Sequence, residues 1–450
     1  MAERKFFGEP IGLAYLAFTE AWERFSFYGM GALLVLYMSQ SLLLPGHAEH
    51  VAGFAGFRAA IQAVTGPLTP IALASIIYGL YSGLVYFTPI LGGLLADRLL
   101  GARTTVVIGA ALMSAGHIAM AFDVSFLFAL LLLIVGCGCL KGNISAQVGG
   151  LYDREDDAGR TRAFAIFSMG INVGAVTGPL LCGLLAQVFG WHAGFAAAGV
   201  LMLASLATYL SGLKHLPPPV TRNADAPPRA ALTANEWRTI GLLMGVIGIS
   251  IFQSLAYYQI SDVGLIWIQQ KVALDTPLGH LPVSWFNSVD SFVSILVVAP
   301  LFALWRWQAR RGGEPDDLGK IGLGAAIACA SALVLATASA LSGPVSPLWP
   351  LVSFTGMGVA FIYYWPTLLA LVSRRAPAHL TGTLLGVTFL SLFFSNIIMG
   401  WFGSFYERLG GVVFWSLDAA IAAVGAVLVV ALRLPLGGGL KLAAAAAPAR

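Results

Sequence analysis

The chain alternates between long apolar runs and short polar stretches. Apolar runs of roughly 20 residues cross a ~30 Å hydrocarbon core as helices, whereas the strands of a membrane barrel would be ~10-residue segments of alternating polarity. The pattern therefore predicts about twelve membrane-spanning helices. They are expected near residues 12–42, 70–96, 104–122, 124–150, 163–187, 192–213, 237–270, 283–308, 319–341, 347–374, 381–406 and 412–433.

One long polar stretch interrupts this pattern in the middle of the chain. It reads "KHLPPPVTRNADAPPRAALTANEWR" from Lys214 to Arg238 and is rich in proline. Such a stretch is typical of a linker, and it leaves an equal number of predicted spans on each side. The expected organisation is an N-terminal six-helix bundle over 1–213, a cytoplasmic linker over 214–236, a C-terminal six-helix bundle over 237–435 and a disordered tail over 436–450.

Composition supports the membrane class. Hydrophobic residues make up 58% of the chain and charged residues 10%, against about 25% charged residues in soluble proteins. A water-soluble globular protein is therefore excluded, and the fold class is an all-α integral membrane protein. The first apolar segment has no small-residue cleavage site, so we expect no cleavable signal peptide.

The loops between the predicted spans differ in charge. Nearly all lysines and arginines fall in alternate loops on one side, whereas the other side holds only Arg58, Lys271 and Arg408. By the positive-inside rule, both termini are expected in the cytoplasm of a multi-pass protein of the plasma or inner membrane. The net charge of +4 thus reflects topology and gives no reason to propose a nucleic-acid partner.

The stretch "TEAWERFSFYGM" places Glu20, Glu23 and Arg24 inside the first span, where each charge costs ~2.5–3.5 kcal/mol on insertion scales. At 100° per residue these side chains and that of Tyr28 lie within an arc of ~140°, so they share one face. Lys141, in the fourth span, reaches a similar depth from the opposite side. We expect the four charges to form a neutral cluster in which each has an opposite partner. Such a cluster either only locks helices together or marks a substrate or proton pathway.

Other polar residues within or near the spans carry weaker signals. The four cysteines lack nearby histidines, so apolar packing is favoured over metal or disulfide roles. His117 lies in the third span, where polar packing and a proton relay are the two interpretations. Asp262 and Asp418 are expected near the ends of their spans, at the membrane interface.

The residues of the first span resemble a known signature. "ERFSFYGM" is similar to the E-x-x-E-R-F motif of the proton-coupled oligopeptide transporters, a branch of the major facilitator superfamily. Further along, "CLKGNISAQVG" resembles the fourth-span segment of that family, and "FSMGINVGAVTGPLLCG" resembles its fifth-span signature. The resemblance extends along nearly the whole chain and implies the twelve-helix fold of that superfamily.

This resemblance implies a function and a site. Family members import di- and tripeptides with the inward proton gradient, so protons serve as the coupling ion and no other cofactor or metal is expected. A working unit of one chain is expected. The resemblance implies Glu20, Glu23, Arg24 and Lys141 in proton coupling, and Arg24, Tyr28, Tyr81, Lys141 and Asn172 in substrate binding. To these we add two residues at positions where the chain departs from the family, Asp290 in both roles and Tyr258 in substrate binding. A zwitterionic peptide would meet cations, acids and aromatic walls in such a site.

The chain also departs from the family pattern. Gly31 and Tyr258 stand where the family has an Arg and a Glu that are expected to pair, and Phe361 replaces the tenth-span Glu expected to pair with Lys141. Lys141 must then rely on the first-span acids, the substrate or water, or lose its proton and be neutral. Asp290 replaces an Asn, and we expect it to bind the substrate ammonium or a second proton. A water-exposed or helix-capping role for Asp290 is the alternative.

The sequence offers no nucleophile with its base and no metal set, so an enzyme is not expected. Two other functions stay open beside peptide symport. One is a symporter of another small zwitterion or an anion. The other is a sensor that binds peptide without net transport. This function stays open because the chain lacks the family's Arg and Glu at Gly31 and Tyr258, which are expected to pair as an extracellular gate.

Overall fold

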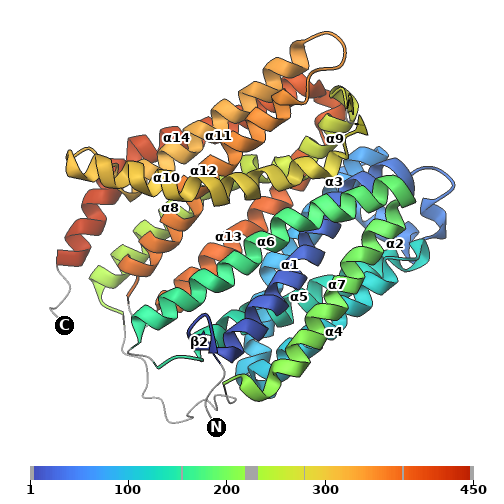
Figure 1. The fold of residues 1–450 in the computed structure, drawn as a ribbon. Coiled ribbons are helices and arrows are strands. Elements are labelled where there is room, and N and C mark those ends of the chain that lie inside the picture. The colour runs from blue at the N-terminus through green and yellow to red at the C-terminus, as the bar shows by residue number, and fades with distance from the viewer. Residues whose placement is uncertain (1–4, 154–155, 218–231, 278, 378–379, 446–450) are drawn as a thin grey trace. The chain divides into compact units, whose positions relative to one another are not determined.

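The structure is a computed structural model, and it describes residues 5–153, 156–217, 232–277, 279–377 and 380–445. Within these ranges it is almost entirely helical (Figure 1). The long helices are α1 (Ile11–Tyr37), α3 (Pro70–Leu95), α4 (Gly101–Ala119), α5 (Phe126–Gly149), α6 (Asp157–Phe189), α7 (Trp191–Gly212), α8 (Ala234–Tyr258), α10 (Val289–Arg310), α11 (Asp317–Ala340), α12 (Leu348–Arg375), α13 (Thr381–Gly403) and α14 (Tyr406–Ala445). The short elements are α2 (Phe54–Thr65), α9 (Val263–Lys271) and the strand pairs β1 (Lys5–Phe6) with β2 (Glu9–Pro10) and β3 (Asp275–Thr276) with β4 (Gly279–His280).

The described residues contain the spans that the pattern predicts. Ten stretches are long and apolar enough to cross a membrane, and one of them, Pro70–Ala119, contains both α3 and α4. Helix α1 is not among the ten because it carries Glu20, Glu23 and Arg24, but its 27 residues extend ~40 Å at 1.5 Å each. The prediction of an all-α membrane protein with about twelve spans is therefore confirmed.

The chain divides into two compact units. Unit 1 comprises Met1–Ala224 and His280–Ser288, and unit 2 comprises Asp225–Gly279 and Val289–Arg450. The segment His280–Ser288 differs from the predicted boundaries, which place it in the C-terminal bundle. It joins unit 1 because Ser288 Oγ and Trp285 Nε1 donate hydrogen bonds to backbone carbonyls of α6, at 2.8 and 2.9 Å.

In unit 1, α1 packs along α6 and α7, and glycines allow its close approach to α6 (Figure 1). A Cβ atom added at Gly174 would lie 2.6 Å from the Ala21 carbonyl oxygen, and one at Gly178 would lie 2.4 Å from that of Phe25. Small residues bring the backbones of membrane helices together in this way. The polar face of α1 is therefore held among other helices of unit 1.

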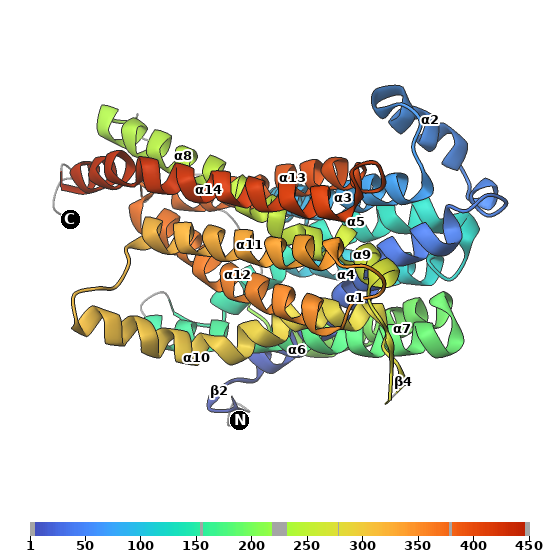
Figure 2. The same cartoon turned by 90° about the horizontal axis from the view of Figure 1, so that it is seen from above.

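In unit 2, α11 lies between α12 and α14, and α8 packs against α13 and α14 (Figure 2). Large apolar side chains from these helices form a buried core that includes Leu243, Leu368 and Val372. Helix α10 packs on α12, where Leu301 meets Ile362 and Tyr363.

The seventh span is broken, whereas the sequence predicts one helix over 237–270. Helix α8 is followed by a 3-10 turn, Gln259–Ser261, and then by α9. The break falls at Asp262, whose φ of −115° and ψ of −101° are not helical. Membrane helices tolerate such breaks where protein groups satisfy the freed backbone.

The two ends of the predicted organisation also differ in detail. Helix α8 begins at Ala234, inside the predicted linker, and most of that linker lies outside the described residues. Helix α14 continues to Ala445, so 436–445 is helical where a disordered tail was predicted. The rest of that tail lies outside the described residues.

A polar contact fixes the N-terminal strand pair on unit 1. Glu9 is buried and accepts hydrogen bonds from Arg162 Nε at 2.6 Å and from the Tyr152 hydroxyl at 3.0 Å. The hydrogen bond from Arg162 lowers the pKa of the Glu9 carboxyl below its ordinary 4.5. The carboxylate form thus ties the start of α1 to the start of α6.

Candidate functional site

The charged residues of α1 form an ionic cluster, Glu20–Glu23–Arg24, which is called the α1 cluster below. Arg24 Nε lies 3.3 Å from Glu20 Oε1, and Arg24 Nη2 donates to Glu23 Oε1 at 2.6 Å. Arg24 Nε also donates to the second oxygen of Glu23. The exposed fractions of Glu20, Glu23 and Arg24 are 3%, 0% and 3%, so each charge depends on its neighbours. The helix itself creates the pairing because Glu20 and Arg24 are four residues apart.

The two carboxylates of the α1 cluster are not equivalent. Both oxygens of Glu23 accept hydrogen bonds from Arg24. Glu20 Oε2 is buried and has no hydrogen-bond partner among the described residues. One guanidinium thus serves two carboxylates, and the free oxygen of Glu20 is the natural place for a proton.

Lys141 does not complete the cluster as an ion pair. Within the described parts of the chain, no carboxylate lies within 4.0 Å of its ammonium, so the predicted pairing with Glu20 or Glu23 is wrong for this conformation. The ammonium instead lies 4.4 Å from the ring centre of Tyr86 on α3 and 5.9 Å from that of Phe27. Aromatic faces attract cations, and this explains how the charge is held without an acid.

Phe27 links the two cations. The Arg24 guanidinium lies 4.9 Å from the centre of its ring and 6.0 Å from that of Tyr28. Sequence reasoning missed both Phe27 and Tyr86. Phe27 could have been found by helical spacing, since it lies one turn after Glu23. No local signal assigned Tyr86, because its contact with Lys141 joins α3 to α5.

The other predicted residues of unit 1 lie on three different helices. Tyr81 on α3 is buried, within electrostatic range of Glu23 and Arg24. Tyr28 on α1 and Asn172 on α6 are half-buried. The structure therefore places Tyr28 and Tyr81 near the α1 cluster, whereas it assigns Asn172 no contact with that cluster.

In unit 2, Asp290 is the centre of a second polar group. The Tyr257 hydroxyl donates to Asp290 Oδ2, and Ser291 Oγ lies 3.4 Å from Oδ1. The Tyr257 ring stacks on the ring of Phe361, with 5.1 Å between the ring centres, and makes an edge contact with the ring of Tyr258, with 5.2 Å between the centres. Tyr257, which sequence reasoning missed, thus connects the predicted residues Tyr258 and Asp290.

The alternatives for Asp290 can now be narrowed. Its exposed fraction is 8%, so the interpretation of Asp290 as a water-exposed carboxylate is wrong. It is the second residue of α10, in the first turn, where the helix dipole stabilises a negative charge. A buried acid at a helix start with a tyrosine donor is compatible with binding either a cation or a proton.

Three further polar residues are buried, and two of them, Asp262 and Asp418, were expected at the membrane interface. Asp262 and Asp418 are fully buried, so the prediction that they lie at the interface is wrong. Neither oxygen of Asp418 and neither ring nitrogen of His117 has a hydrogen-bond partner among the described residues. Asp418 was misplaced because the span begins at Tyr406, earlier than the predicted 412, which puts this residue in the middle of its helix.

Comparison with known proteins places this fold in a family. Residues 16–400 match the sequence profile described as Major Facilitator Superfamily. The chain belongs to the major facilitator superfamily. One relative, the uncharacterized transporter YclF of Bacillus subtilis (strain 168), is 29% identical to it, over 94% of this chain and 93% of the relative.

Peptide-transporting members of the superfamily are similar over the same length. A di-/tripeptide transporter of Lactococcus lactis subsp. cremoris is 29% identical, over 96% of this chain and 97% of the relative. The crystal structure of a mutant of the peptide transporter POT in complex with alafosfalin has a TM-score of 0.84 and 28% identity, and it covers 98% of this chain and 97% of the other. The predicted fold and the predicted resemblance to this branch are confirmed.

Proposed function

We propose that this superfamily member imports di- and tripeptides together with protons. Two similar proteins carry the names di-/tripeptide transporter and peptide transporter, and the match extends over most of each chain. The observation that carries the proposal is the α1 cluster, where one buried guanidinium holds two buried carboxylates and one carboxylate oxygen stays unpaired. Buried ionisable groups in a membrane protein mark substrate or proton pathways.

The geometry supports a competition between proton and substrate. A proton on Glu20 would neutralise the acid that is held by only one contact and would loosen its hold on Arg24. The guanidinium could then receive the carboxylate of a peptide, for which its planar donors are suited. Lys141 would add a second cation that contacts aromatic faces and has no carboxylate of the described residues within 4.0 Å, so an arriving carboxylate would not have to break such an ion pair.

For unit 2, the proposal gives Asp290 the acidic role. Its carboxylate would bind the ammonium of the substrate or take a second proton. Tyr257 would orient it through the hydrogen bond to Oδ2. The neighbouring rings of Tyr258 and Phe361 would supply apolar contact for variable side chains.

The test is uptake of labelled dialanine into proteoliposomes with an imposed inward proton gradient. Wild type should accumulate the peptide. Glu20→Gln should abolish accumulation but keep exchange between equal concentrations, because a neutral side chain imitates the protonated state. Glu23→Gln and Lys141→Ala should lower peptide affinity, and Glu49→Gln, at an exposed acid, is the matched control. Unchanged proton-driven accumulation in Glu20→Gln would refute the proposed coupling role.

The same vesicles separate the two other candidate functions. Competition of dialanine uptake by other small zwitterions and anions would identify a transporter of a different substrate. A peptide sensor would show saturable binding without counterflow of labelled peptide. Asp290→Asn belongs in both assays, since unchanged affinity and unchanged pH dependence would remove Asp290 from the site.

The setting of the transporter is part of the proposal. We expect a monomer in the plasma or inner membrane with cytoplasmic termini, no catalytic activity, no nucleic-acid partner and no cofactor besides the proton. The charge of the loops supports this orientation. Labelling of single cysteines introduced beside Arg58 and Arg311 with an impermeant reagent would test it, because only the first should react from outside.

A further inference from the structure

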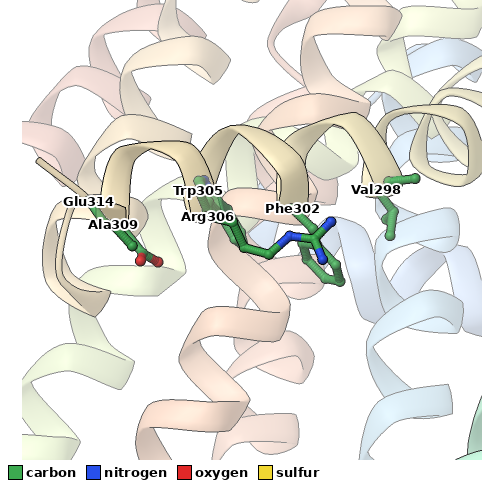
Figure 3. Close-up of a pocket in the computed structure, with 7 residues that line it drawn as sticks. Val298, Phe302, Trp305, Arg306, Ala309 and Glu314 are labelled. Carbon is green, nitrogen blue, oxygen red and sulfur yellow. The ribbon is translucent and has the colours of Figure 1, made fainter. Parts of the chain in front are cut away.

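A groove runs along α10 in unit 2, apart from every residue of the candidate site. Its volume is about 500 Å³, and Figure 3 shows the residues that line it. Those residues are Val298, Ala299, Phe302, Trp305, Arg306, Ala309 and Glu314. All but Glu314 belong to α10, where spacings of three and four residues put them on one face of the helix. The groove is therefore a stripe along a single helix.

This helix is the least buried of the candidate spans. Only 22% of the 18-residue apolar stretch in this span is buried, against 33% or more of the corresponding stretch in each of the other candidate spans. Phe302 in the groove is 48% exposed. Large exposed apolar surfaces on a membrane helix need an apolar partner, and the hydrocarbon of the bilayer supplies one.

The polarity of the groove changes along the helix. Its first part is apolar, with Val298, Ala299 and Phe302, and its later part carries Trp305 and Arg306. Arg306 lies eight residues after Val298, which is ~12 Å along the axis. The sequence "WRWQARR" at 305–311 has the tryptophans and arginines typical of a membrane–water interface. The apolar part then lies at the depth of acyl chains and the arginine at the depth of headgroups.

The charges around the groove leave Arg306 without an acid. Glu314 is paired with Lys320 at 2.6 Å, and that ammonium also lies 4.0 Å from the ring centre of Trp305. No carboxylate of the described residues lies within 4.0 Å of the Arg306 guanidinium. In Figure 3 the Arg306 side chain extends toward Phe302, away from Glu314. The groove thus offers an unneutralised cation beside an apolar surface.

We propose that this groove binds a phospholipid with an anionic headgroup. The phosphate pairs with Arg306, and one acyl chain lies along Phe302, Ala299 and Val298. Arg310, the last residue of the same helix, and Arg311, which follows it, are exposed and add positive charge around the headgroup. This surplus of positive charge favours a lipid with net negative charge over a zwitterionic one.

The experiment measures lipid binding to the full-length protein in detergent by native mass spectrometry, with phosphatidylglycerol and phosphatidylcholine of equal acyl length. Wild type should bind phosphatidylglycerol about fivefold more tightly, the effect of one basic residue at an anionic surface. Arg306→Gln should remove this preference. Arg408→Gln is the matched control, because Arg408 is an exposed arginine beside an aromatic ring, Phe405, elsewhere in unit 2.

A second variant tests the apolar half of the groove. Phe302→Ala should weaken the binding of both lipids equally and keep the preference for phosphatidylglycerol. Equal binding of the two lipids by wild type would overturn the proposal, whatever the variants do. An equal effect of Arg306→Gln and Arg408→Gln on the headgroup preference would also overturn it. Thermal stabilisation by inorganic phosphate as large as that by phosphatidylglycerol would overturn it as well, because it would indicate a site for free anions.

Discussion

The two units bury acids in different ways. In unit 1, Glu20 and Glu23 are paired with Arg24, which is the only arginine or lysine among the buried residues that the structure describes. In unit 2, Asp290 is held by a tyrosine hydroxyl, and Asp418 has no partner among the described residues. The first arrangement keeps charges in the membrane by compensating them. The second relies on neutral donors or on none.

This difference bears on function. A compensated cluster can exchange partners, because a proton or a substrate carboxylate can replace one member of a pair. An acid held by a hydroxyl can gain or lose a proton without breaking an ion pair. Removing a single partner of a buried acid should therefore change stability and transport more in unit 1 than in unit 2.

The largest effect is expected from Arg24→Gln. It leaves two buried carboxylates without a cation, and breaking a buried ion pair costs about 3–5 kcal/mol. The melting temperature in detergent should fall strongly, and proton-driven uptake should be lost. The double variant Glu23→Gln/Arg24→Gln should recover part of the stability. If the melting temperature of the double variant fell as far as that of Arg24→Gln, the unpaired Glu23 carboxylate would not be the cause of the destabilisation.

A smaller effect is expected from Tyr257→Phe in unit 2. It removes only the hydroxyl that donates to Asp290, which should cost about 1–3 kcal/mol. The stacking on Phe361 is kept. Thermal unfolding of Tyr257→Phe, Asp290→Asn and the double variant measures the coupling between the two residues. Additive effects of the two changes would show that this hydrogen bond does not hold Asp290.

Asp418→Leu should act in the opposite direction. A buried acid with no donor destabilises the folded protein, and an apolar side chain of similar size avoids this cost. We expect a gain of about 1–3 kcal/mol, seen as a higher melting temperature. Asp418→Asn should gain less, because its amide would be buried without a partner as well. A loss of stability in Asp418→Leu would reveal a partner for this acid.

The smallest effect is expected at the ion pair between Glu9 and Arg162. Because Arg162 lowers the pKa of Glu9 below 4.5, the carboxylate stabilises the folded state above that pH. The contribution is lost as the pH falls through the lowered pKa. Melting temperatures measured from pH 7 to pH 3 should therefore decline less in Glu9→Gln than in wild type. Parallel curves would exclude this contact as a source of acid sensitivity.

Much of the candidate site was visible in the sequence. The shared face of Glu20, Glu23 and Arg24 follows from helical geometry, and the structure shows Arg24 between both acids. Lys141 was expected to find an acid and instead meets Tyr86 on another helix. Tyr257 was not predicted, although it lies beside Tyr258, because its partner Asp290 is distant in the sequence.

The sequence by itself determined the number and class of the spans and the face on which α1 carries its charges. These features depend on the periodicity of neighbouring residues and on the free energy of placing side chains in hydrocarbon. Only the tertiary structure decided which partner each buried polar group has and that the seventh span is broken. Those outcomes depend on side chains from other helices, whose approach no local pattern encodes.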